Sequence, residues 1–170
     1  MSTLTSRPMS LLWIDFNELY ARHLCRHSQL GVNVVHLAAL AGIWYGVYAA
    51  LYTVTASPYV PIGLAMCYFA VLALNTPPRV LAVVAVLLAL LVAAVVAVPA
   101  PPQWAFWIYL LPIPILYKVQ SWSHTIWHTE RDLGEFNRKY TKGFVLFVVL
   151  LFYEVPIVLN FLAFDHKHWE

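Results

Sequence analysis

Charged residues are scarce in this sequence. Asp, Glu, Lys and Arg make up only 11% of the 170 residues, whereas soluble domains average about 25%. The hydrophobic share is 62%, which argues against an ordinary soluble domain. The apolar stretches are continuous and near the roughly 20 residues that a membrane-spanning helix needs, and they lack the alternation of a membrane barrel. The composition therefore predicts an all-α integral membrane protein.

Cysteine is also scarce, and so are the motifs that depend on it. Cys25 and Cys67 stand far apart in different surroundings, and we interpret both as free thiols that pack like small apolar side chains. The sequence contains no CxxCH motif for covalent haem attachment. The first apolar patch, residues 9–14, is too short to serve as the core of a cleavable signal peptide.

We expect one membrane domain over residues 1–170, a helical bundle of about five spans. Residues 10–28 show a helical pattern with one polar face, which predicts an amphipathic helix on the membrane surface. Paired prolines after Thr76 end the second span, and Pro112 and Pro114 are expected to kink the fourth. The five spans are expected near residues 33–54, 59–74, 80–98, 103–122 and 143–164.

The basic residues divide unevenly between the two sides that five spans create. One side receives only Lys167, and the other receives the remaining nine of the ten. By the positive-inside rule the basic side faces the cytoplasm, across an inner membrane in a bacterium or the endoplasmic reticulum in a eukaryote. The nine are Arg7, Arg22, Arg26, Arg79, Lys118, Arg131, Arg138, Lys139 and Lys142.

Five histidines are expected on that cytoplasmic side. His124 and His128 stand one helical turn apart, on a polar stripe that also carries Gln120. His23 and His27 repeat this spacing, and His36 lies inside the first span, where an ionisable group indicates a functional site. Taken singly, each surface histidine could be a solvated imidazole. Together they predict a metal site, whereas His166 and His168 belong to the tail.

The types of side chain available as ligands narrow the choice of metal. Imidazoles with few cysteines favour iron, copper or catalytic zinc over a structural zinc site. Glu154, near the middle of the last span, is predicted to orient a metal-bound histidine, although it could also be the partner of a buried histidine or arginine. Tyr20 and Trp127 are placed near the metal, where they would contact a lipid whose polar head reaches it.

These motifs resemble the fungal 2-hydroxy fatty acid dioxygenase family. His27 and His36 have the nine-residue offset of that family, and Gln120 precedes His124 by four residues, as in the family. Glu130 and Glu154 match the spacing of its two later glutamates. The sequence departs from the family in several places. The family's asparagine would fall one residue before Asn33. The family's glycine is replaced here by Ser123, and one of the family's glutamates by His128. Either His124 or His128 could therefore be the family ligand.

The resemblance implies an iron(II)-dependent dioxygenase, with zinc as a possible substitute metal. Such an enzyme shortens a 2-hydroxy fatty acid by one carbon with molecular oxygen and without 2-oxoglutarate. Its metal ligands would come from the five histidines, with Glu154, Gln120 and Glu130 as catalytic groups. Arg131 or Arg26 could pair with the substrate carboxylate, or serve only as topological charges. We expect no nucleic-acid partner.

Three other interpretations remain open from the sequence. The histidines could bind haem non-covalently or sense a metal without catalysis. A diiron membrane hydroxylase or desaturase would need repeated HxxxH and HxxHH boxes, and the sequence contains no HxxHH. A purely structural membrane protein is the third.

Overall fold

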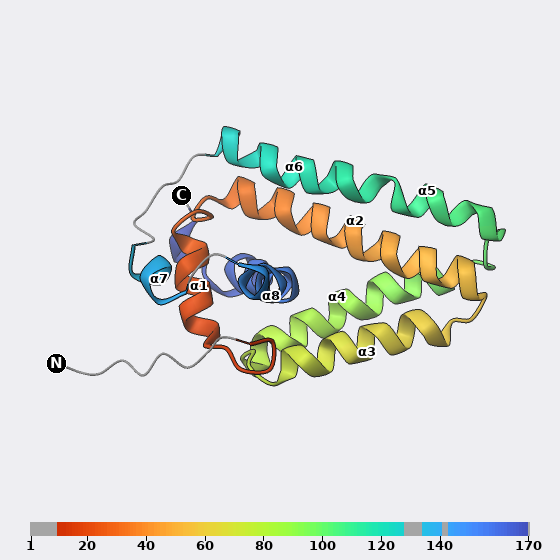
Figure 1. Ribbon diagram of the computed structural model, residues 1–170, viewed down its shortest axis with the longest axis horizontal. Helices are drawn as coiled ribbons and strands as arrows, with labels where there is room; N and C mark the ends of the chain where they lie inside the picture. Colours follow the sequence, from red (N-terminus) through yellow and green to blue (C-terminus); the bar gives the residue numbers. More distant parts are fainter. Residues whose placement is uncertain (1–9, 128–133, 141–142, 170) are drawn as a thin grey trace.

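The computed structural model describes residues 10–127, 134–140 and 143–169 (Figure 1). Within these residues every regular element is helical, and the only extended pairing is an isolated bridge between Ser10 and Trp13. The predicted all-helical class is therefore confirmed. The elements are α1 (Phe16–Leu24), α2 (Leu30–Thr55), α3 (Tyr59–Ala73), α4 (Pro78–Val96), η1 (Gln103–Ala105), α5 (Phe106–Leu110), α6 (Pro112–Ile126), α7 (Gly134–Lys139), α8 (Phe144–Phe164) and η2 (His166–His168).

Among the described residues, three helices are long and apolar enough to cross a membrane. These are α2 with 26 residues, α4 with 19 and α8 with 21. Helix α3 is apolar but has only 15 residues, about 22 Å at 1.5 Å per residue. The expected fourth span is divided at Leu111 into α5 and α6, directly before Pro112. Membrane association is thus consistent with the structure, and the break coincides with the kink expected at Pro112.

Helix α2 packs closely along α5 and α6. A Cβ atom at Gly46 would lie 2.6 Å from the backbone oxygen of Tyr109, and one at Gly42 would lie 2.8 Å from Leu116 Cδ1. Glycines four residues apart let membrane helices approach in this way. Because the two segments run antiparallel (Figure 1), the start of α2 meets the end of α6. This packing brings His36 and His124 to the same end of the molecule.

Helix α8 lies across the other long helices. In Figure 1 it is seen nearly end-on, between α2 on one side and α3 and α4 on the other. Every residue from 155 to 161 is buried. The tail that follows returns to α1, where the Tyr20 hydroxyl donates to Asp165 Oδ2 at 2.5 Å. The tail and α1 therefore lie together at one end of the structure, whereas five spans predicted them on opposite sides of the membrane. A helix that runs crosswise leads the chain back to the end it came from.

Several hydrogen bonds hold α1 at this end of the bundle. The Asp15 carboxylate accepts from the amides of Asn17 and Glu18 and so caps the helix. At the other side of α1, Tyr140 donates to Glu18 Oε2 at 2.7 Å. Ile14 N donates to Asn75 Oδ1 at 3.3 Å, which ties the segment before α1 to the turn between α3 and α4. Helix α1 and the segment that follows it are therefore fixed over the opening of the bundle.

Candidate metal centre

His27, His36 and His124 converge at the end of the bundle. One ring nitrogen of each lies within 4.8 Å of those of the other two. The ring centroids are 4.8 Å apart for His27 and His36, 4.6 Å for His27 and His124, and 5.1 Å for His36 and His124. His27 follows α1, His36 lies in the second turn of α2, and His124 lies in the last turn of α6. Two parts of the chain far apart in sequence, residues 27–36 and the end of α6, thus supply one cluster of imidazoles.

Backbone carbonyls orient two of these rings. His36 Nδ1 lies 2.8 Å from the oxygen of Val32, and His27 Nδ1 lies 3.3 Å from the oxygen of His23. A ring nitrogen that meets a carbonyl is the one that carries the proton, so each ring keeps its lone pair on Nε2. Metal-binding histidines characteristically hold their second nitrogen in this way. The two rings are therefore prepared as Nε2 ligands.

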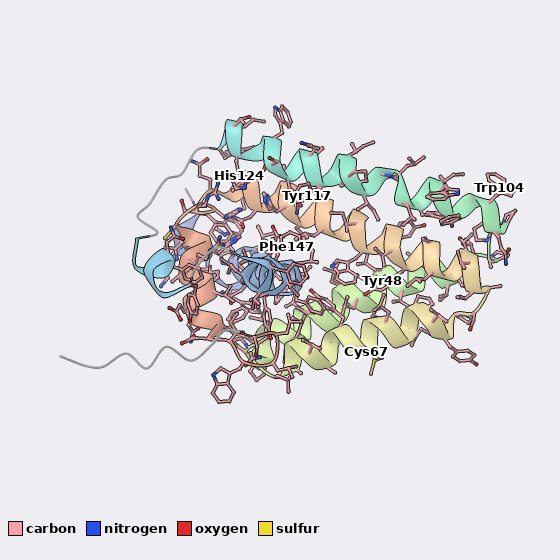
Figure 2. The ribbon with its side chains drawn as sticks, viewed as in Figure 1. Tyr48, Cys67, Trp104, Tyr117, His124 and Phe147 are labelled. Atoms are coloured by element: carbon pink, nitrogen blue, oxygen red, sulfur yellow. The ribbon has the colours of Figure 1, made fainter. Side chains whose placement is uncertain are left out.

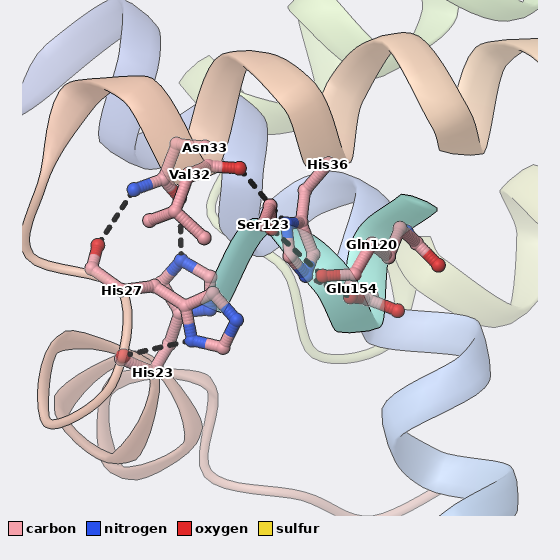
Figure 3. Close-up of polar contacts among 8 residues, drawn as sticks. All are labelled: His23, His27, Val32, Asn33, His36, Gln120, Ser123 and Glu154. Carbon is pink, nitrogen blue, oxygen red and sulfur yellow. Dashed lines mark hydrogen bonds and ion pairs between the residues drawn. The ribbon is translucent and has the colours of Figure 1, made fainter. Parts of the chain in front are cut away.

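His23 packs against His27 on the side away from the other two histidines of the cluster. Its ring stacks on that of His27, with centroids 4.2 Å apart and planes 5° from parallel, and its Nε2 lies 2.7 Å from Asn33 Oδ1 (Figure 3). Asn33 Nδ2 donates to the oxygens of His27 and Gln29 at 2.6 and 2.9 Å. With both amide hydrogens engaged, Asn33 must accept from His23. The structure leaves His23 outside the three-histidine group, so its prediction as a ligand is not supported.

Burial keeps the histidines around α1 neutral. It lowers the pKa of His23 to about 3, although the hydrogen bond to Asn33 acts in the opposite direction. Burial, together with the positive charge that His23, His36 and His124 carry when protonated, also places the pKa of His27 well below its usual value. A metal ion requires the neutral imidazole. The environment therefore stabilises the protonation state that metal binding needs.

Glu154 faces the same nitrogen of His36 that a metal would use. Its Oε1 lies 3.7 Å from His36 Nε2, and the Glu154 side chain is 29% exposed (Figure 3). Because the Nδ1 atom of His36 already meets Val32, Glu154 does not orient the second nitrogen of that ring. The orienting role predicted from the sequence stays a prediction, and the contact with buried His36 agrees with the alternative of a partner to a buried histidine. Glu154 instead places a carboxylate beside the point where the histidines converge.

A cavity of about 740 Å³ opens from the cluster into the bundle. Its polar wall includes Gln120, whose buried Nε2 has no partner among the described residues, and Arg22, whose buried Nε likewise has none there. Burial and the nearby Arg26 guanidinium lower the pKa of Arg22. Figure 2 shows His124 and Trp104 at opposite ends of the α5–α6 segment, so the polar lining around His124 lies at the end of the bundle where the histidines meet. Most of the rest of the wall is apolar: Leu19, Leu40, Ile43, Trp44, Val47, Leu64, Phe147, Leu150, Leu151, Phe152 and Ile157.

The remaining predicted site residues have different positions. Arg26 lines the cavity, and its contact with a substrate stays a prediction. Tyr20 instead bonds to Asp165 on the other face of α1. Trp127 packs over Gly31, where an added Cβ would collide with the indole ring. Neither aromatic is among the described residues that line the cavity, so their predicted contact with the substrate is not supported. His128, Glu130 and Arg131 lie outside the described residues.

Three further contributors are not predicted from the sequence. Arg22, expected there only as a topological charge, lines the cavity. Asn33 holds His23, and the hydroxyl of Ser123 lies 3.5 Å from His36 Nδ1. The motif of the resembled family has an asparagine one residue away from the position of Asn33, and this near match is the sequence signal that could have indicated Asn33. For Arg22, the signal is its place four residues before Arg26 on one helix face.

Comparisons of the chain with protein-family models, with curated proteins and with solved structures give no match. The resemblance to the 2-hydroxy fatty acid dioxygenases therefore remains a prediction, and the three-histidine cluster at the mouth of an apolar cavity carries the functional argument.

Proposed function

We propose that this protein is a membrane-embedded, non-haem iron(II)-dependent dioxygenase that shortens 2-hydroxy fatty acids by one carbon. The observation that carries the proposal is the meeting of His27, His36 and His124 on the polar side of a cavity whose wall is largely apolar. Imidazole is a good ligand for iron, and three such ligands leave positions for a substrate. A lipid with a small polar head fits a cavity whose wall is polar beside the histidines and mostly apolar elsewhere.

The metal would be held by His27, His36 and His124. Their neutral rings, two of them fixed through Nδ1, match the donor set that iron(II) takes, and the same set accepts zinc. When bound, iron(II) supplies the one-electron and dioxygen chemistry that protein side chains lack. His128 belongs to the proposal as a further ligand candidate, because it follows His124 by one helical turn in the sequence.

Charged and polar groups would hold the head of the substrate. Arg22 and Arg26 both line the cavity, and a guanidinium binds a carboxylate through two parallel hydrogen bonds. The Gln120 amide has an unused hydrogen there, available to a hydroxyl or carboxylate oxygen. Glu154 stands beside His36 Nε2, where its carboxylate can accept the proton of a 2-hydroxyl group. The apolar wall would hold the acyl chain and exclude water.

The histidine end is proposed to face the cytoplasm. Arg22, Arg26 and Arg79 lie at this end, and the tail with Lys167 joins them beside α1. An excess of Lys and Arg marks the cytoplasmic side of membrane proteins. In this arrangement α2, α3, α4 and the α5–α6 segment run along the membrane normal, and α8 lies across them. The crossing of α8 replaces the fifth span of the sequence-based prediction.

The test is metal content and oxygen consumption of the full chain in detergent. Protein prepared without oxygen and loaded with iron(II) should hold one ion per chain, and should consume oxygen with 2-hydroxypalmitate but not with palmitate. The carbon-shortened product is followed by mass spectrometry. Protein that binds no iron would contradict the metal centre. One iron per chain without a response to 2-hydroxypalmitate would leave the centre and reject the substrate, and an intense Soret band would indicate haem instead.

A further inference from the structure

A second cavity, of about 430 Å³, lies on the opposite face of α1. It is enclosed by α1, the start of α4, the end of α8 and the tail, and it shares no lining residue with the metal cavity. Its lining includes basic side chains and one carboxylate: Arg79, Lys167 and His168 with Asp165. We propose that it binds the phosphoethanolamine headgroup of a membrane lipid. This proposal does not depend on the dioxygenase activity.

A hydrogen-bonded chain forms the acidic side of this cavity. Tyr20 donates to Asp165 Oδ2 at 2.5 Å, and His168 Nδ1 lies 2.6 Å from Asp165 Oδ1. Burial and the Asp165 carboxylate raise the pKa of Tyr20, so its hydroxyl keeps the proton and remains the donor. Asp165 is only 8% exposed. A buried carboxylate is held in place at the wall of the cavity and keeps lone pairs for one more donor.

Asn160 supplies the second observation that points to a ligand. Its side chain lines the cavity and is 5% exposed, yet its Oδ1 has no hydrogen-bond donor among the described residues. Buried amide oxygens in proteins are nearly always paired. In this proposal the missing partner is a donor bound in the cavity that Asn160 lines. An ammonium group can donate to Asn160 Oδ1 and to the Asp165 carboxylate at the same time.

The cationic side of the cavity fits the phosphate of the same headgroup. Arg79 lies in the first turn of the apolar helix α4, and its guanidinium carbon is 5.2 Å from the centre of the Phe164 ring. Arg79 and Lys167 are both exposed at the cavity. Basic residues at the end of a membrane helix stand at the depth of lipid phosphates. A ligand with an ammonium group for the acidic wall and a phosphate for the basic wall has the chemistry of a phosphoethanolamine headgroup. The neighbouring α4 offers an apolar surface for the acyl chains of the lipid.

Native mass spectrometry of the full chain in detergent tests this inference. Phosphatidylethanolamine, phosphatidylglycerol with the same acyl chains, and soluble phosphoethanolamine are added separately. We expect a retained phosphatidylethanolamine adduct in the wild type, at least tenfold weaker retention of phosphatidylglycerol, and no retention of the soluble compound. Asn160→Leu and Arg79→Gln should each weaken the adduct at least tenfold. Lys118→Gln, which removes an exposed charge on α6, is the matched control and should not change it.

The readouts separate the possible failures. Arg79→Gln changes an exposed side chain, so its result stands even if Asn160→Leu impairs folding. Equal retention of the two lipids, or equal weakening by Lys118→Gln, overturns the proposal in favour of general attraction to lipid. Binding of soluble phosphoethanolamine alone overturns the lipid as the source of the headgroup. Iron content of the Arg79 and Asn160 variants should equal that of the wild type, because the two cavities have no lining residue in common.

Discussion

The two ends of the bundle have opposite chemical character. At the tip end, the turns around Ala56 and Ala100 and the start of α5 present only apolar and neutral polar side chains. Between residues 37 and 117 the sole charged residue is Arg79, and it lies at the histidine end, beside Phe164 and the tail. The histidine end therefore contains both polar cavities and the possible metal ligands. The fold concentrates its chemistry by bringing antiparallel helix ends together.

The difference teaches how a small membrane protein can build a site without a polar domain. Each of the three clustered histidines stands at or near the end of a helix, where the chain is already close to water. Burial then comes from α1 and α8, which close this end from outside and from within. The tip end has no such cover and needs none, because uncharged turns cost little to place at or within a membrane boundary.

The largest effect is expected from cysteine labelling, which tests the comparison directly. In a chain with Cys25→Ser and Cys67→Ser, single cysteines replace Asn137, Lys167 or Gln103, which lie in α7, the tail and η1. In sealed vesicles, Asn137→Cys and Lys167→Cys should react with an impermeant reagent from the same face, and Gln103→Cys only from the other. If Lys167→Cys were instead labelled from the same face as Gln103→Cys, five spans would be restored and the crosswise position of α8 contradicted.

The next largest effect concerns the ligands themselves. Single substitutions His27→Ala, His36→Ala and His124→Ala should each reduce iron affinity by more than the roughly 10–100-fold typical of a lost outer partner. Metal analysis after dialysis against a weak chelator measures the loss. His166→Ala is the control, since His166 is exposed in the tail. Full metal retention in both the His36 and the His124 variants would mean that the site lies elsewhere.

Glu154 should affect turnover more than metal content. Glu154→Gln keeps the shape and removes the base, so we expect iron to stay bound while oxygen consumption with 2-hydroxypalmitate falls by about 100-fold or more. Glu18→Gln, on α1 and bonded to Tyr140, controls for loss of a carboxylate at this end. Loss of iron from the Glu154 variant would make the residue a ligand, and unchanged turnover would make it a packing residue.

The sequence predicted which histidines come together better than it predicted how the helices are arranged. Spacing and position within spans selected five histidines, among them His27, His36 and His124, because an imidazole at the end of an apolar run is costly to bury unless it binds a partner. Period and hydropathy could not reveal that α8 runs crosswise, since a crosswise helix buried between α2 and α4 is as apolar as a spanning one. Nor could they show that Tyr20 turns away from the histidine cluster, because which face of α1 meets which cavity depends on where the tail returns.

The smallest effects are expected from three glycine substitutions that compare packing along the bundle. At Gly46 an added Cβ meets the backbone oxygen of Tyr109 at 2.6 Å, which cannot move without shifting a helix. Gly46→Ala should therefore destabilise the protein by about 1–3 kcal/mol.

At Gly31 the obstacle is the Trp127 side chain, which can rotate, so Gly31→Ala should cost less and mainly change tryptophan fluorescence. Gly63 in α3 has open space around it, and Gly63→Ala should be neutral or stabilise by up to roughly 1 kcal/mol through helix propensity. Denaturation of the three variants in mixed micelles gives the ranking. If Gly46→Ala is as stable as Gly63→Ala, the close approach of α2 to α5 is absent, and with it the packing that brings His36 to His124.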